Sequence, residues 1–345
     1  MRPGFLRSGM VAIFFAGALL PAPRGNAAEQ DAVTVDADTE AVIHGALNYL
    51  AGQQGSNGAW TQRPGSAQYP VAMTGYALMA FLSTGNLPDE GEYGRNVTAG
   101  MEYLLNDIGP DGIFRDANQG KYMYNHGIAT VALCELYGET GSPVLRQRIE
   151  QLVGVIVNGQ SAMGGWRYKP GAKDADISVT VLQVAALRAA KNAGLAVPQG
   201  TIDRAVAFIG QCYKQDSGGF AYKPGGAPGF ARTAAAIYSL QVCGRYNDPE
   251  VGKGSDYLFA NDDENAEWWA YGCYYAAPAE YMIGGDNWGR WYGLMKTVLL
   301  GSVVRSGELC YWDEKRSQKL GPNYETAVFV TVLAMPYHYL PLYQR

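Results

Sequence analysis

Two kinds of apolar pattern alternate along this chain. Segments of the first kind place apolar residues three or four positions apart among charged ones, as in 149–156, which is typical of a helix with one buried face. Segments of the second kind are apolar on nearly all sides, as in 179–186, and such a helix is buried on most faces. The alternation predicts an outer layer of helices around an inner layer.

The predicted helices form six pairs, each with an outer helix, a turn and an inner helix. Outer helices are expected at 40–53, 95–106, 143–158, 201–213, 248–259 and 288–302, and inner helices at 71–83, 126–138, 177–193, 232–244, 269–282 and 324–335. Four of the inner helices carry a threonine near their start, at Thr74, Thr180, Thr233 and Thr326. We expect these hydroxyls to cap exposed backbone groups locally.

A glycine-rich turn that ends in an aromatic residue recurs between the paired helices. The aromatic residues Trp60, Phe114, Trp166 and Phe220 follow one another at intervals of 54, 52 and 54 residues. Two degenerate copies lie around 268–269 and 310–312. A long period with helices on both sides predicts stacked helix pairs. Six copies without a polar end face predict closure, so we expect an all-α chain folded as a single (α/α)6 toroid.

The segment 1–28 has the features of a signal peptide. Arg2 and Arg7 precede a short apolar core at 11–20, and small residues follow. We therefore expect cleavage near its end and an exported protein, periplasmic or secreted. The apolar core is too short for a stable membrane anchor, and the sequence predicts no integral membrane segment.

After this segment the sequence predicts a linker at 29–37 and one toroid domain at 38–345. Charged residues make up only 17% of the chain, below the roughly 25% of ordinary soluble domains, as an inner layer of buried helices would require. The net charge of −5, without a run of Lys or Arg, argues against nucleic-acid binding. The five cysteines are an odd number and include no C-x-x-C pair, and we expect them to be mostly small buried side chains.

The glycine-aromatic turns resemble those of the terpenoid-cyclase and protein-prenyltransferase toroids, over nearly the whole mature chain. The strongest local match runs from Gly164-Gly165-Trp166 to Ser178. It is similar to the squalene-hopene cyclase stretch in which a Gly-Gly-Trp turn precedes Asp-x-Asp-Asp-Thr. Asp174 matches the first Asp and Asp176 the middle one, which is the initiating acid in that family. Ile177 replaces the third Asp, and Ser178 stands in place of the Thr.

The resemblance implies an exported toroid whose aromatic-lined central cavity binds or cyclises an isoprenoid lipid. If the chain is an enzyme, the resemblance implies a terpene-cyclase-like isomerase or lyase with an Asp general acid. The alternative is a non-catalytic exported toroid that mediates protein or glycan interaction. These two classes differ in the cavity, which is deep and aromatic for the first and filled for the second.

The candidate catalytic residues are Asp176, Asp174 and His126. Burial and a neighbouring carboxylate both raise the pKa of an Asp, which suits an acid that must stay protonated. His126 opens the second inner helix and could act as acid or base beside Asp176. The alternatives are that Asp176 caps the third inner helix and that His126 is a structural histidine.

Aromatic and polar residues at the inner-helix starts form the candidate substrate-binding set, because a ring places these starts around one mouth. Aromatic faces stabilise cations, although packing of the ring core explains the same residues. The set comprises Trp166, Tyr124, Arg232, Trp269, Tyr271, Tyr274, Tyr275, Tyr324 and Glu325.

Three other toroid functions fit the sequence less well. A zinc prenyltransferase needs a metal-ligand set, and His126 with Cys134 has no suitable spacing. A thioester toroid needs a Cys-Gly-Glu-Gln run, which is absent. A polysaccharide lyase needs a cationic cleft, whereas this chain is acidic and its inner helices hold few lysines. The sequence thus predicts no metal and no cofactor, and it does not identify a protein partner.

Overall fold

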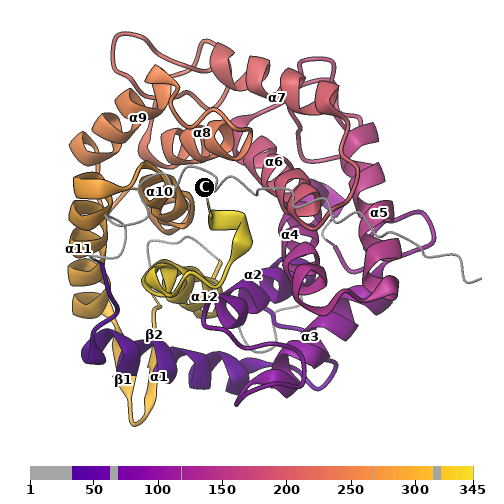
Figure 1. Ribbon diagram of the computed structural model, residues 1–345, viewed down its shortest axis with the longest axis vertical. Coiled ribbons are helices and arrows are strands. Elements are labelled where there is room, and N and C mark those ends of the chain that lie inside the picture. The colour runs from indigo at the N-terminus through magenta and orange to yellow at the C-terminus, as the bar shows by residue number, and fades with distance from the viewer. Residues whose placement is uncertain (1–32, 63–68, 118, 267, 314–319, 345) are drawn as a thin grey trace, which may run out of the picture.

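The computed structural model describes residues 33–62, 69–117, 119–266, 268–313 and 320–344. The predicted signal peptide lies outside these residues. Twelve α-helices in the described part alternate between an outer and an inner layer (Figure 1). The outer helices are α1 (Ala37–Gln53), α3 (Gly94–Asp107), α5 (Pro143–Asn158), α7 (Gln199–Gln211), α9 (Pro249–Ala260) and α11 (Gly285–Ser302). The inner helices are α2 (Pro70–Ser83), α4 (Tyr122–Thr140), α6 (Ile177–Asn192), α8 (Phe230–Val242), α10 (Trp269–Ile283) and α12 (Pro322–Leu333).

The inner helices form a closed ring. Each packs against the next inner helix along the chain, and α12 packs against α2 (Figure 1). The predicted (α/α)6 toroid is therefore confirmed. Burial separates the two layers as the apolar pattern predicts: 13 of the 14 residues of α2 are buried, but only six of the 14 in α3 are.

The turn aromatics join the two layers by hydrogen bonds. In the first repeat the backbone N–H of Trp60 donates to Oγ1 of Thr74 at 3.0 Å, and the indole Nε1–H donates to the carbonyl oxygen of Leu50 at 2.7 Å. Trp166 repeats both contacts, with Thr180 at 3.0 Å and with Ile156 at 2.7 Å. The threonines thus bind the turns rather than cap their own helices, which corrects the sequence interpretation.

Phe220 and Trp312 make the same backbone contact with Thr233, at 2.9 Å, and with Thr326, at 3.2 Å. In the first four repeats a glycine before the aromatic residue is required where the turn meets the next outer helix. Gly164 has φ +95°, and a Cβ at this position would collide with the backbone of Arg204. The fifth repeat departs from the pattern, because Trp268 lies directly before α10 and not in such a turn.

The C-terminal segment closes one end of the ring. After α12, the short helices η3 (Met335–Tyr337) and η4 (Pro341–Tyr343) lead the chain into the ring centre (Figure 1). The N–H of Leu342 donates to Glu135 at 3.4 Å, and the hydroxyl of Tyr343 donates to that of Tyr274 at 3.1 Å. Because Glu135 lies in the second half of α4, this segment fills the ring at the C-terminal side of its helices.

The remaining elements lie outside the inner ring. A single turn, η2 (Gln119–Lys121), precedes α4, and strands β1 (Val304–Ser306) and β2 (Leu309–Tyr311) form a hairpin that packs against α1. The five cysteines are free, and all but Cys243 are buried. Within the described ranges, every helix is too short or too polar to cross a membrane.

Candidate functional site

The open end of the ring holds a cavity of about 590 Å³, which we call the mouth cavity. All six inner helices contribute residues from their N-terminal ends or from the segments just before them. Its described lining residues are Tyr69, Ala72, Met73, Tyr76, Lys121, Tyr124, Asn125, Tyr168, Ser178, Tyr222, Gly229, Phe230, Ala231, Arg232, Ala266, Trp268, Tyr271, Leu320 and Tyr324. Seven of these residues are tyrosines, and none is Asp, Glu or His.

Four predicted binding residues line this cavity: Tyr124, Arg232, Tyr271 and Tyr324. Burial raises the pKa of the Tyr124 and Tyr271 hydroxyls well above the ordinary value, so both stay neutral. The hydroxyl of Tyr271 donates to the carbonyl oxygen of Ser178 at 2.7 Å, which fixes its ring across the ring centre from α6.

The other predicted aromatics lie outside the described lining. Tyr274 and Tyr275 are buried in an aromatic cluster with Tyr76. The ring centroid of Tyr274 lies 5.2 Å from that of Tyr76 and 5.2 Å from that of Tyr275. The indole of Trp269 donates to Asp262 at 2.8 Å. Trp166 is fully buried in its turn. These side chains therefore support the ring core.

Asp176 lies behind the cavity wall and caps α6. Its Oδ1 accepts from the N–H of Val179 at 2.9 Å and from the hydroxyl of Ser178 at 2.7 Å. Its Oδ2 forms an ion pair with Arg167, and the Asp176 side chain is fully buried. These contacts support the interpretation of Asp176 as a helix cap. They do not support a role as an acid, because neither carboxyl oxygen of Asp176 faces solvent.

Arg167 connects both predicted acids to the wall. Its Nε lies 3.4 Å from Asp174, and its Nη1 donates to the hydroxyl of Tyr222 at 2.5 Å. Its guanidinium stacks 4.0 Å above the centroid of the Tyr168 ring. Asp174 is half-exposed, and hydrogen bonding to Lys223 at 2.7 Å holds its pKa below the ordinary value. Both predicted acids therefore pair with cations.

In the second repeat the hydroxyl of Tyr122 takes the place of the recurring threonine, and His126 bonds this hydroxyl from behind. The N–H of Phe114 donates to the hydroxyl of Tyr122 at 3.1 Å, and this hydroxyl bonds Nδ1 of His126 at 2.9 Å. The other ring nitrogen bonds the carbonyl oxygen of Leu152 at 3.0 Å. Burial lowers the pKa of His126 to about 4. His126 therefore joins the layers, and neither of its ring nitrogens contacts Asp176.

Glu325 is buried at the start of α12 and lies outside the described lining. Several lining residues escaped the sequence analysis. Tyr168 and Tyr222 occupy equivalent places, two residues after the turn aromatics Trp166 and Phe220, so aligning the repeats beyond the turn would have revealed them. Their hydroxyls lie 3.0 Å apart.

Tyr69 and Trp268 are two further lining residues with unusual backbones. Tyr69 has φ +60° directly before α2, and Trp268 has φ +67° directly before α10. This left-handed conformation is costly for bulky residues and is concentrated at functional sites. The side chain of Trp268 is also exposed at 42%. The strain places both aromatic side chains at the rim of the cavity.

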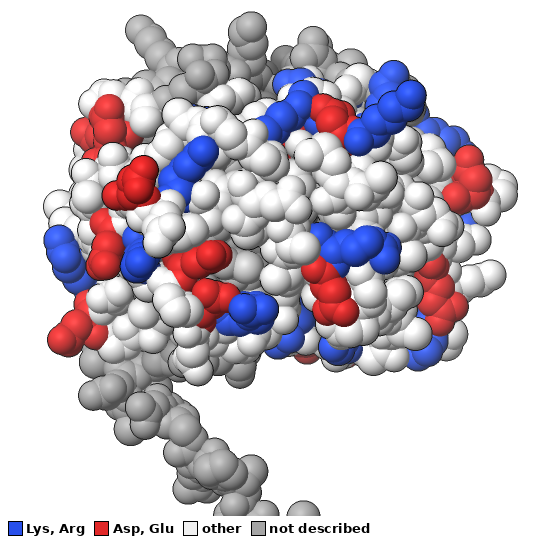
Figure 2. Space-filling model, turned by 90° about the horizontal axis from the view of Figure 1, so that it is seen from above, with Lys and Arg blue, Asp and Glu red and all other residues white. Residues whose placement is uncertain are grey.

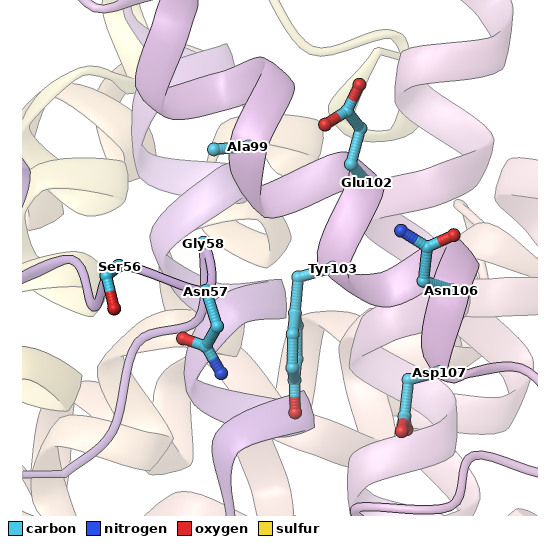
Figure 3. A pocket seen from close by; sticks show the side chains of 8 residues that line it. All are labelled: Ser56, Asn57, Gly58, Ala99, Glu102, Tyr103, Asn106 and Asp107. Atoms are coloured by element: carbon cyan, nitrogen blue, oxygen red, sulfur yellow. The ribbon is translucent and has the colours of Figure 1, made fainter.

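A second hollow lies on the outer wall, between the first turn and α3 (Figure 3). Its acidic residues do not face one another, since Glu102 points away from Asp107 (Figure 3). Both oxygens of Asp107 accept from the N–H of Asp116 at 3.1 Å. A similar hollow recurs one repeat later with a different lining. The recurrence indicates a consequence of repeat stacking rather than a ligand site.

No protein-family model and no curated protein matches the sequence. Solved structures do match. An inactive variant of the α-1,6-mannanase GH76A of Salegentibacter sp. HEL1_6, in complex with α-1,6-mannotriose, has TM-score 0.61 and 10% identity, over 87% of this chain and 98% of that one. A sugar epimerase from a ruminal bacterium has TM-score 0.63 and 12% identity, over 86% and 97%. The cellobiose 2-epimerase from Spirochaeta thermophila DSM 6192 has TM-score 0.63 and 12% identity, over 87% and 96%.

At such low identity the similarity shows the fold alone. These neighbours act on sugars, however, and none of the three is a terpene cyclase or prenyltransferase. The prediction that this chain binds or cyclises an isoprenoid is therefore wrong, and the predicted apolar ligand is unsupported. The alternative of glycan interaction agrees better with the neighbours. The mouth cavity is open and aromatic rather than filled, so the expectation that a filled cavity marks the interaction class is wrong. The shared architecture is the (α/α)6 toroid, which unrelated activities use.

Proposed function

We propose that this chain is an exported glycan-binding toroid that holds a carbohydrate in the mouth cavity. The observation that carries the proposal is the lining of seven tyrosines with few charged groups. An aromatic ring offers an apolar face to the C–H face of a sugar, while the phenol hydroxyl bonds the sugar hydroxyls. Burial raises the pKa of Tyr222, so its hydroxyl remains neutral and can donate.

A buried amide in the same wall favours a hydroxylated ligand. Asn125 is fully buried and lines the cavity, and its Nδ2 donates to the carbonyl oxygen of Lys121 at 3.2 Å. Its Oδ1 has no hydrogen-bond partner in the described part of the chain. A buried acceptor without a donor costs about 1–3 kcal/mol. A sugar hydroxyl would supply the donor, and an isoprenoid could not.

The absence of acids from the described lining favours binding over hydrolysis. Most glycosidases place two carboxyl groups on either side of the scissile bond, roughly 5–10 Å apart. Here the two candidates, Asp174 and Asp176, share Arg167 behind the wall. The proposed role is therefore recognition of a glycan outside the cytoplasm, and N-terminal sequencing from the native host tests the export step.

A glycan array followed by calorimetric titration of the strongest oligosaccharide tests the proposal. We expect Trp268→Ala to weaken binding about tenfold, because a rim aromatic loses its stacking surface. The matched control is Tyr339→Ala, which removes an aromatic exposed at 55% on the closed side of the ring. Equal affinity in both variants would place the binding site elsewhere. Release of new reducing ends during the titration would replace binding with hydrolysis.

A further inference from the structure

The charges behind the cavity wall balance one another. Asp174 pairs with Lys223 at 2.7 Å, and Asp176 pairs with Arg167, which also lies 3.4 Å from Asp174. Two carboxylates thus face two cations. This group contributes no net charge to the cavity, although its members hold the wall tyrosines.

Two further cations line the cavity without such partners. Lys121 lies directly before α4, and Arg232 lies in the first turn of α8. Within the described chain neither forms an ion pair, and the described lining contains no acid. Asp262 and Glu325, which flank the starts of α10 and α12, lie outside that lining. The described lining therefore carries two uncompensated positive charges.

The helix directions add to this positive potential. The N-terminal ends of all six inner helices meet at the mouth, and each N-terminus carries a partial positive charge. The outer wall differs, because acidic and basic side chains alternate over the face in Figure 2. The whole chain has a net charge of −5, so the two cations of the lining contrast with an acidic molecule.

We infer that the mouth cavity selects an anionic saccharide, in which a carboxylate or sulfate group contacts Lys121 and Arg232. This inference rests on the proposed glycan-binding function and names its ligand class. Guanidinium and ammonium groups form strong charge-assisted hydrogen bonds with such anions. The tyrosines of the wall pack against the sugar ring between the two cations, which come from α4 and α8 on either side of α6.

The test compares oligosaccharides that differ only in charge. Calorimetric titration uses a galacturonate oligomer, its fully methyl-esterified form and a sulfated oligosaccharide of the same length. We expect an anionic form to bind about tenfold more tightly than the ester, since one charge-assisted contact is worth that much. The preference should weaken with added salt, because ions screen exposed charges.

Variants assign the preference to the two cations. Lys121→Gln together with Arg232→Gln should abolish the difference in affinity between acid and ester. The control Lys191→Gln removes one positive charge from the last turn of α6, far from the mouth, and should keep the difference. Circular dichroism confirms that each variant is folded.

The outcomes distinguish failure of the anionic preference from failure of glycan binding itself. Tighter binding of only the galacturonate or only the sulfated oligosaccharide supports the inference and identifies the anionic group. Equal affinity for acid and ester, or binding of neutral glycans alone, overturns the inference and leaves glycan binding intact. Failure of every oligosaccharide, charged or neutral, overturns both.

Discussion

Replacing Asp176 by Asn separates a positioning role from an acid role. Asn keeps the cap of α6, because it accepts from the N–H of Val179 about as well as Asp does. It removes the charge that faces Arg167 inside the wall. If Asp176 anchors the wall, the variant should lose stability. If Asp176 is only a cap, stability should hardly change.

The structure sets the size of this loss. Breaking a fully buried ion pair by removing one partner costs about 3–5 kcal/mol. Arg167 is one-fifth exposed and keeps Asp174 near its Nε, so solvent and the second acid compensate part of the cost. We expect Asp176→Asn to lower the free energy of unfolding by about 2 kcal/mol. Asp176→Ala also loses the cap, and the loss should rise to about 3 kcal/mol.

Urea unfolding measures this loss, with an unchanged m-value as evidence that the same surface is exposed. Asp174→Asn is the matched control, because Asp174 contacts the same Arg167 from a half-exposed position. Its effect should be the smaller of the two. Equal midpoints for the two Asn variants would refute the anchoring role. A stable Asp176→Asn protein that lost turnover on some glycan would instead identify Asp176 as a catalytic acid.

Three further predictions concern the buried polar groups. Burial raises the pKa of Glu135 to about 8, so its contribution to stability should decline as pH rises from about 4.5 to 8, and Glu135→Gln should remove that decline in thermal melts. Burial lowers the pKa of His126 to about 4, so stability should fall as pH drops from about 6.5 to 4, on the order of 3 kcal/mol in total. His126→Gln should lack this acid dependence, and an unchanged dependence would contradict the assignment. Thr180→Val leaves the N–H of Trp166 without its acceptor and should cost about 1–3 kcal/mol in urea unfolding, whereas Thr180→Ser should cost less.

The fold could be predicted from the sequence because the same glycine-aromatic turn recurs between the paired helices. The first four repeats need a glycine where the turn meets the next helix, and an aromatic residue that fills the space between the layers. Gly164 and Trp166 meet these needs in the third repeat. The regular spacing of such residues makes them recognisable in the sequence. The role of Thr180 could not be predicted in the same way, since its partner lies 14 residues away across a turn.

The wrong prediction of cyclase function has a physical explanation in the turn of the third repeat. The resemblance to cyclases rests on a Gly-Gly-Trp turn followed by Asp174 and Asp176. In this structure the turn serves layer packing, and Asp176 serves the cap and Arg167. Unrelated toroids face the same packing problem, so such residues recur without a shared reaction. The cavity wall depends instead on Tyr168 and Tyr222, which lie two residues after their turn aromatics, whereas the first two repeats have Gln62 and Asp116 at that place.

The two ends of the ring differ in a way that supports the open end as the functional one. At the closed end, Leu342 and Tyr343 are buried, and they donate hydrogen bonds to Glu135 and Tyr274 of the inner helices. At the open end, Tyr69 and Trp268 hold left-handed backbone conformations that cost of order 1–3 kcal/mol each. His338 has a similar conformation at the closed end, but it is not a residue of the mouth cavity. A fold maintains such strain only where the surrounding structure enforces it. Both residues line the mouth cavity, so we attribute the strain to the position it gives to these rim aromatics.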